Sequence, residues 1–138
     1  MDFPIYLLHV TFAWFYANCK DRFNDLYLRD APTPENREAF WEELIARKDP
    51  RLDRHPVLKR RNWKRNGIAL AIHGDVVPVI RVGKAHTIGY EAMSFQSLIS
   101  HGSTLTLKQL ICGAFPDTMT DRSALEIWEI ICWSLHWL

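Results

Sequence analysis

The stretch Ile68–Val82, IALAIHGDVVPVIRV, decides the fold. Two apolar runs rich in β-branched residues lie on either side of a short polar interruption, which is typical of two strands with a tight connection. We expect strands at 68–73 and 76–82, joined at Gly74 and Asp75. The first run is apolar at nearly every position, as in strands that are buried on both faces. We therefore predict that it is the most buried strand and that Asp75 lies at its end.

The sequence after this stretch continues the strand pattern. Residues 90–100 alternate, with Met93 and Phe95 on one side and polar residues on the other. Gly83-Lys84 marks a second tight connection, and residues 104–115 fit both a strand and a helix. Because such short connections exclude a helical crossover, neighbouring strands should pair antiparallel. The C-terminal half therefore predicts an antiparallel meander of three to four strands.

The regions on either side of the strands have helical patterns. Apolar residues recur at helical spacing over residues 5–28. A second helix is expected from Pro34 to about Lys48, because Thr33 can cap it and proline suits a first helical position. The last segment, ALEIWEIICWSLHWL (124–138), predicts a helix that is apolar on nearly every face. The N-terminal apolar run of about 15 residues is shorter than the roughly 20 that cross a membrane, so we predict no membrane span.

Together these patterns predict the α+β class. The expected organisation is a helical N-terminal region at 1–48, a basic connector at 49–66 and a β-rich domain at 67–138 that ends in an apolar helix. Nearly half of the 138 residues are apolar, so the chain can form the core of one domain. The three cysteines form no C-x-x-C pair, and the sequence therefore contains neither a zinc knuckle nor a redox motif.

Charge is divided unevenly along the chain. The net charge is +1, yet the segment Arg47–Arg65 carries +7 and the rest of the chain therefore −6. Its nine basic residues are Arg47, Lys48, Arg51, Arg54, Lys59, Arg60, Arg61, Lys64 and Arg65. Such an asymmetry indicates a polyanion as partner.

The basic segment has two interpretations. Its cations can contact phosphates while its tryptophan stacks on a base. The candidate residues for nucleic acid are Arg54, Lys59, Arg60, Arg61, Trp63, Lys64 and Arg65. The alternatives are a solvated linker for the cations and a place in the core, beside Ile68, for the tryptophan.

Asp75 and His73 share one side of the predicted strand, because side chains alternate along a strand. A carboxylate there suits Mg²⁺, which is usually held by one or two carboxylates and by substrate phosphates. The alternative is an aspartate in a hairpin turn, where Gly-Asp is common. His73 is either a second metal ligand or a core histidine that donates a hydrogen bond to a carbonyl.

The motif HGDVVPV (73–79), followed by Gly83-Lys84 and by the segment Leu98–Gly102, resembles the start of the catalytic domain in DDE-type transposases, which have a ribonuclease H-like fold. The likeness is to Plavaka and CACTA-type elements and to the multicopy HGDGVPV proteins of transposon-rich eukaryotic genomes. It covers roughly residues 60–138, and IICWSLHWL is similar to the helix that follows in those proteins. The resemblance implies that the meander is the start of a ribonuclease H-like fold.

The same resemblance implies a metal-dependent polynucleotidyl transferase that uses Mg²⁺ or Mn²⁺. Asp75 would be the first catalytic, metal-binding carboxylate, and Asp117 is the candidate for the second, although FPDTM is typical of a turn. A two-metal site needs further acidic ligands, and no third downstream acid fits. We therefore expect a fragment or degenerate copy that is inactive as this chain and resides in the nucleus or cytoplasm.

Two hypotheses follow for the function. The first is a transposase-derived catalytic-core fragment that binds nucleic acid weakly and without sequence specificity. The second is a non-enzymatic module that binds a protein partner, or a second copy, through its apolar terminal helices. The second hypothesis predicts an exposed apolar surface on these helices, made chiefly by Phe12, Phe15, Trp133 and Trp137.

Overall fold

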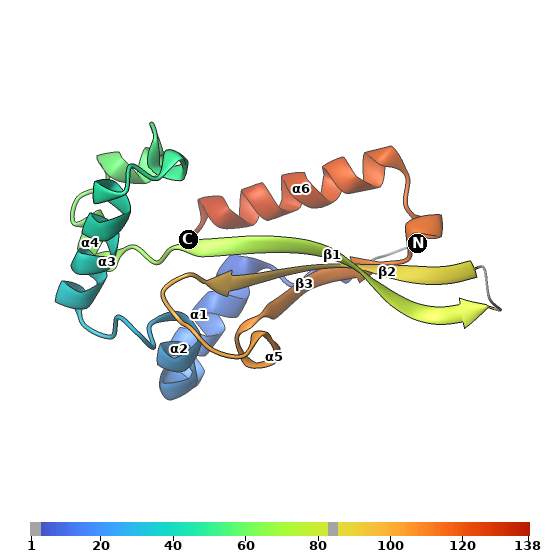
Figure 1. Ribbon diagram of the computed structural model, residues 1–138, viewed down its shortest axis with the longest axis horizontal. Helices are drawn as coiled ribbons and strands as arrows, with labels where there is room; N and C mark the ends of the chain where they lie inside the picture. Colours follow the sequence, from blue (N-terminus) through green and yellow to red (C-terminus); the bar gives the residue numbers. More distant parts are fainter. Residues whose placement is uncertain (1–3, 83–85) are drawn as a thin grey trace. The chain divides into compact units, whose positions relative to one another are not determined.

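The computed structural model describes residues 4–82 and 86–138, without the side chains of residues 80–82, 86–88, 117 and 121. It confirms the α+β class, with helices and a three-stranded antiparallel sheet in the order β1-β2-β3 (Figure 1). The elements are α1 Leu8–Asn18, α2 Lys20–Tyr27, α3 Pro34–Ala46, η1 Pro50–Leu52, η2 Pro56–Lys59, α4 Trp63–Asn66, β1 Leu70–Val82, β2 His86–Ser97, α5 Thr104–Leu107, β3 Gln109–Ala114, η3 Pro116–Thr118 and α6 Asp121–His136. None of the helices in the described ranges has the length and apolar character that a membrane crossing requires.

The chain forms two compact units, and each unit consists of segments that are separated in the sequence. The first unit consists of Met1–Lys20, Ile72–Phe95 and Lys108–Leu138, and the second of Asp21–Ala71 and Gln96–Leu107. The division follows packing and not chain order, whereas the regions expected from the sequence were continuous. β1 and β2 each contribute residues to both units.

The N-terminal helical region is divided at Cys19. A single helix over residues 5–28 was expected, but the backbone of Cys19 has φ −139° and ψ 64°, which separates α1 from α2. The side-chain amide of Asn18 donates a hydrogen bond of 2.9 Å to the carbonyl oxygen of Trp14. The backbone N–H of Cys19 still donates to the carbonyl of Phe15 at 2.9 Å, so α1 ends at Asn18 with its last turn closed.

The expected start of α3 is confirmed, whereas α6 begins at Asp121, before the expected segment 124–138. Thr33 caps α3 by accepting a hydrogen bond from the backbone N–H of Asn36, and Pro34 occupies the first helical position. At α6 the cap is Thr120, which forms a reciprocal capping box with Ser123. Both caps provide acceptors for N–H groups that have no partner within the helix.

The prediction of two strands joined at Gly74 and Asp75 is wrong. One strand of 13 residues, β1, continues through both residues. A Cβ added to Gly89 would lie 2.5 Å from Cγ1 of Val76, so β2 already lies beside β1 directly after the supposed turn. The predicted connection at Gly83-Lys84 includes residues outside the described ranges.

The prediction that the first strand is the most buried is also wrong. In the order β1-β2-β3, β1 lies at the edge of the sheet, and its residues 74–79 are exposed. Asp75 therefore lies within an exposed edge strand and not at the end of a central one. Pro78 fits this position, because a residue that cannot donate to the ladder is found at sheet edges.

The third strand comes later in the chain than expected. The pattern at 90–100 belongs to β2, and β3 lies within the segment 104–115, which fitted both a strand and a helix. Both alternatives are realised there, because the short helix α5 is followed directly by β3. β2 and β3 pair antiparallel, with Met93 opposite Cys112 and Glu91 opposite Ala114.

In the first unit, α6 runs along one face of the sheet (Figure 1). Ile127 and Ile131 of α6 are buried. α1 packs against α6, and Nδ1 of His9 lies 2.9 Å from Oγ of the fully buried Ser134. The backbone N–H of Tyr6 donates to the carbonyl of Ile111 at 2.7 Å, so the segment before α1 lies beside β3.

The second unit has buried side chains on α2, on α3 and in the segment after β2, and α3 packs against α4. The largest of these buried side chains are Phe23, Leu26, Tyr27, Trp41, Ile99 and Leu107. Buried Ser97 donates a hydrogen bond of 2.9 Å to the carbonyl of Tyr27. The hydroxyl of Ser100 accepts from the backbone N–H of Arg29 at 3.1 Å. These bonds satisfy backbone groups at the end of α2 that burial would otherwise leave unpaired.

Candidate functional site

The predicted metal-binding residues of β1 lie in different environments. Asp75 is exposed, whereas His73 is half-buried. The Nε2 atom of His73 is buried and has no hydrogen-bond partner within the described part of the chain. The expected bond from this histidine to a backbone carbonyl is therefore not made through Nε2 with a described residue.

The described residues contain no group of three His, Cys, Asp or Glu side chains that could hold a metal ion. Asp117, the predicted second carboxylate, lies in η3, and its side chain is outside the described part. Among described side chains, the donor set proposed for Mg²⁺ or Mn²⁺ is limited to Asp75 and His73.

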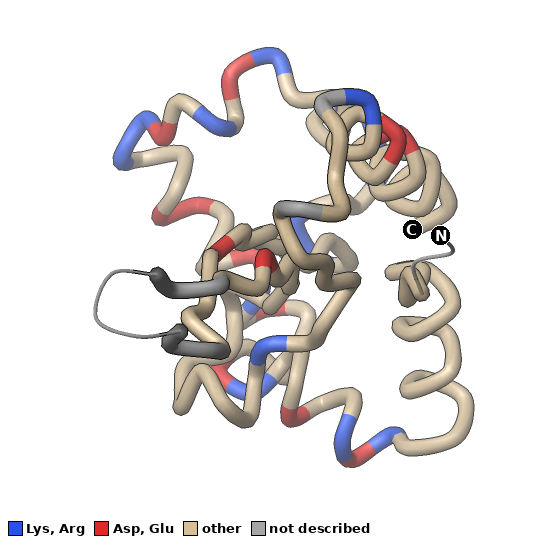
Figure 2. The backbone as a smooth tube through the Cα atoms, turned by 90° about the vertical axis from the view of Figure 1, so that its right-hand side faces the viewer, with Lys and Arg blue, Asp and Glu red and all other residues tan. Residues whose placement is uncertain are grey.

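Four cations of the basic segment are engaged in ion pairs. Figure 2 marks the positions of the basic and acidic residues along the backbone. Arg47 pairs with Glu43 and Arg51 with Asp49. Lys64 lies 3.1 Å from Glu42, and Arg65 pairs with Glu35. The sequence alone does not show which of these acids pairs with which cation. The pairing partly neutralises one end of the predicted nucleic-acid surface, at Lys64 and Arg65.

The pair between Arg51 and Asp49 also organises the start of η1. The carboxylate of Asp49 accepts hydrogen bonds from the backbone N–H of Arg51 at 3.0 Å and from its guanidinium at 2.9 and 2.6 Å. These bonds lower the pKa of Asp49 from 3.8 to about 2, with the guanidinium as the largest cause. Asp49 thus stays charged and Arg51 stays directed at it over the whole physiological range.

The other cations of the segment are exposed and have no carboxylate partner among the described residues. None of them forms an ion pair with an acid inside the described ranges. These residues are Lys48, Arg54, Lys59, Arg60 and Arg61. Lys59, Arg60 and Arg61 are consecutive, and Arg60 has an extended backbone after η2. We call Arg54, Lys59, Arg60 and Arg61 the cation cluster.

Trp63 is engaged in packing within the second unit. Its ring lies edge-on to that of Trp41, with centroids 5.1 Å apart and an interplanar angle of 68°. Trp63 is half-buried and Trp41 is buried. The structure thus shows an aromatic contact of Trp63 with Trp41, whereas the second interpretation placed this tryptophan beside Ile68.

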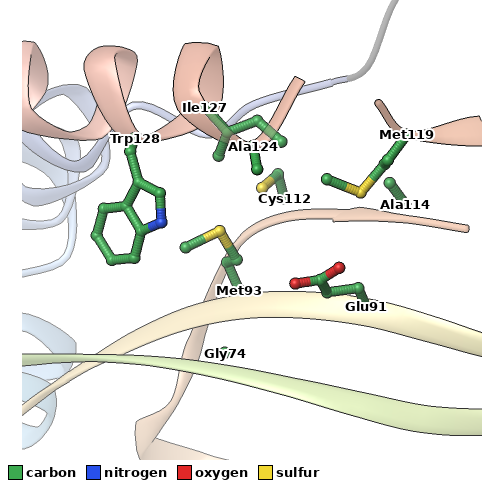
Figure 3. Close-up of a pocket in the computed structure, with 9 residues that line it drawn as sticks. All are labelled: Gly74, Glu91, Met93, Cys112, Ala114, Met119, Ala124, Ile127 and Trp128. Carbon is green, nitrogen blue, oxygen red and sulfur yellow. The ribbon is translucent and has the colours of Figure 1, made fainter. Parts of the chain in front are cut away.

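A small cavity lies between α6 and the sheet face of the first unit (Figure 3). Its volume is about 130 Å³. Side chains alternate along β2 and β3, so their register places Glu91 and Met93 beside Cys112 and Ala114 on one face. Its remaining lining residues are Gly74, Met119, Ala124, Ile127 and Trp128.

The cavity has one acid and one thiol in an otherwise apolar lining. Burial raises the pKa of the Cys112 thiol, and the carboxylate of Glu91 raises it further. Sequence reasoning assigned no role to Met93, Cys112 or Met119. The available signal was the alternation of β2, which places Met93 on an inward face but does not say what lies opposite.

The apolar surface predicted on the terminal helices is present in part. Trp133 and Trp137 are exposed, whereas Phe12 and Phe15 are half-buried. α1 carries no charged residue at all, as Figure 2 shows. The exposed apolar residues of the two helices are Val10, Trp14, Tyr16, Leu125, Trp128, Ile130, Trp133 and Trp137.

Comparisons of the chain with protein-family models, with curated proteins and with solved structures give no match.

Proposed function

We propose that the protein binds nucleic acid through the cation cluster, without catalysis by the residues described. One observation carries this proposal. Within eight residues, Arg54, Lys59, Arg60 and Arg61 are exposed and have no carboxylate partner in the described ranges, while their neighbours Arg51, Lys64 and Arg65 are paired. Cations that are not neutralised internally attract phosphate groups and release the counterions bound there.

The geometry of the cluster favours contact with the backbone of nucleic acid over reading of bases. The short turns η1 and η2 are three and four residues long. Neither offers the extended helix or β-ribbon that enters a major groove. Phosphate contacts position a protein but carry no sequence information. The binding should therefore be weak and independent of sequence.

We also propose that the chain descends from a DDE-type transposase core with a ribonuclease H-like fold. The motif at 73–79 supports this descent, whereas the exposed edge position of β1 departs from the buried first strand that was expected with it. Metal-dependent strand transfer is not part of the proposal. Among the described side chains of β1, Asp75 is the one carboxylate.

The test is fluorescence anisotropy with a labelled duplex at low salt. The triple variant Lys59→Gln, Arg60→Gln, Arg61→Gln should lose most of the binding. The control Lys20→Gln, Lys108→Gln, Arg122→Gln removes the same formal charge from exposed cations elsewhere, of which Arg122 pairs with Glu126, and should keep the binding. Equal losses in both variants would mean that only net charge matters and would refute the cation cluster as the site.

A second candidate function is self-association through α1 and α6. The specific observation is that Trp133 and Trp137 are about half or more exposed, at 51% and 64%, on a helix with further exposed apolar residues. Large exposed apolar patches mark interaction sites. Sedimentation velocity at several concentrations tests it, because a second copy would make the sedimentation coefficient rise with concentration.

A further inference from the structure

Three sulfur-bearing side chains meet at the cavity under α6. Met93 and Cys112 are direct partners across β2 and β3, and Met119 enters from the segment before α6. All three line the same cavity of about 130 Å³, and Figure 3 shows their side chains around one space. Met93 and Cys112 are buried, so two strands fix two of the sulfurs.

We propose that this cavity is a binding site for a soft monovalent metal ion, Cu(I), with Cys112 as thiolate ligand and Met93 and Met119 as thioether ligands. Thiolate and thioether sulfurs select Cu(I), whereas Mg²⁺ and Mn²⁺ prefer oxygen ligands. The site lies in the first unit and uses none of the residues in the cation cluster. It is therefore independent of nucleic-acid binding.

Charge balance favours a monovalent ion in this cavity. As Cu(I) binds, the Cys112 thiol releases its proton to solvent and the sulfur forms a bond to the metal, with no change of oxidation state. One positive ion and one thiolate give a neutral complex, and the two thioethers add no charge. A neutral metal–thiolate unit suits the Met, Ala, Ile and Trp side chains of the lining, because isolated buried charges are strongly disfavoured, and the remaining charge at the cavity is that of the half-buried Glu91 carboxylate.

Glu91 has a different role in the same site. Its carboxylate is half-buried and forms no ion pair with a described residue. Carboxylate oxygen is a hard ligand and competes poorly for Cu(I). Its negative charge attracts a cation to the cavity from solvent, so its removal should slow or weaken uptake without removing the sulfur ligands.

The experiment is an anaerobic titration of the full chain with Cu(I) against a chromogenic Cu(I) chelator. The background is the variant Cys19→Ser, Cys132→Ser, which leaves Cys112 as the single cysteine. We expect one ion per chain in this background. Copper X-ray absorption should show three sulfur neighbours, and Zn²⁺ in equal amount should not displace the ion.

Three variants in that background separate the ligands from the fold. Cys112→Ser should abolish Cu(I) binding. Met93→Leu and Met119→Leu should each weaken the Cu(I) affinity by at least roughly 10- to 100-fold, because even the loss of a residue that only hydrogen-bonds to a metal ligand has an effect of that size. Met-to-Leu exchanges nearly conserve volume and are well tolerated. Circular dichroism shows whether each variant is folded. If Cys112→Ser unfolds the protein, Met119→Leu still tests the site, because Met119 is half-buried in a connecting segment.

The proposal is overturned if the background variant binds no Cu(I) at the chelator's affinity. It is equally overturned if folded Met119→Leu and Met93→Leu bind as tightly as the background. Preference for Zn²⁺ would also contradict it, because a site that prefers zinc is not one built by thioethers.

Discussion

The indole Nε1 of Trp41 donates a hydrogen bond of 3.1 Å to the carbonyl oxygen of Gly67. Trp41 lies on α3, and Gly67 follows α4 immediately before β1. The bond closes the turn that carries Lys64 and Arg65, whose side chains pair with acids on α3. The basic segment is thus anchored at its end by a buried aromatic contact and not by its charges alone.

Replacement of Gly67 by alanine should destabilise this anchor. The added Cβ would lie 2.5 Å from the backbone oxygen of Trp63 and 3.6 Å from the ring of Trp41. Overpacking of this kind costs about 1–3 kcal/mol. Urea denaturation measures the loss. The matched control is Gly74→Ala, where a Cβ meets nothing within 4 Å and the change in unfolding free energy should stay small. Equal losses in the two variants would contradict the steric explanation.

The salt dependence of nucleic-acid binding should report how many residues of the cation cluster contact phosphates. If the four residues of the cation cluster contact phosphates, log affinity against log salt should have a slope of about −3.6 on duplex DNA. The variant Lys59→Gln, Arg60→Gln, Arg61→Gln leaves one contact and a slope of about −0.9. The variant Lys64→Gln, Arg65→Gln should keep the wild-type slope, because these side chains already pair with Glu42 and Glu35. A flatter slope in the second variant would show that the ion pairs open on binding.

Local signals in the sequence were sufficient for part of the fold. The caps of α3 and α6 depend on residues three positions apart, such as Thr33 and Asn36, and a short stretch contains all the information needed. The position of β1 was not predictable in this way. Alternation and apolar content identify a strand. Whether other strands pair with it on one side or on both sides depends on residues that are distant in the sequence. Pro78 was the one local sign of an edge position.

The candidate sites could also be predicted from the sequence only in part. Composition located the basic segment, but its division into paired and free cations depends on Glu35 and Glu42, which lie more than 20 residues away from Lys64 and Arg65. The sulfur cluster depends on the register that places Met93 opposite Cys112. A shift by one residue would turn one of these side chains to the other face. Sequence periodicity alone does not determine that register.

Acidification should weaken the second unit through Asp30. Its carboxylate accepts from the backbone N–H of His101 at 2.6 Å and lies 2.8 Å from the ring Nδ1. These bonds lower the pKa of Asp30 below its ordinary value of 3.8, with the backbone bond as the largest cause. A folded-state pKa below the unfolded one contributes stability above the unfolded value, which is lost as pH falls through the folded value.

The variant Asp30→Asn tests this linkage. Thermal unfolding measured between about pH 6 and pH 2.5 should show a smaller loss of midpoint on acidification in the variant than in the wild type, since one carboxylate no longer titrates. Asp53→Asn, at another exposed aspartate, is the control and should follow the wild type. If Asp30→Asn keeps the full pH dependence, the hydrogen bonds from His101 do not stabilise the folded state.

Self-association, if α1 and α6 form the contact, should be sensitive to charge on α6. Leu125 and Trp137 are 66% and 64% exposed, so the variant Leu125→Lys, Trp137→Lys removes apolar surface without opening the core. Burial of apolar area contributes roughly 25 cal/mol per Å², and a lysine cannot be buried against a second copy without a partner. We expect the wild type to sediment faster as concentration rises and this variant to remain at the monomer value.

Leu105→Lys is the control, because Leu105 is 93% exposed but lies on α5 in the other unit, and it should behave as the wild type. A wild type that stays monomeric at every concentration, or a control variant that dissociates equally, would exclude α1 and α6 as a contact between copies and leave nucleic-acid binding as the proposed function.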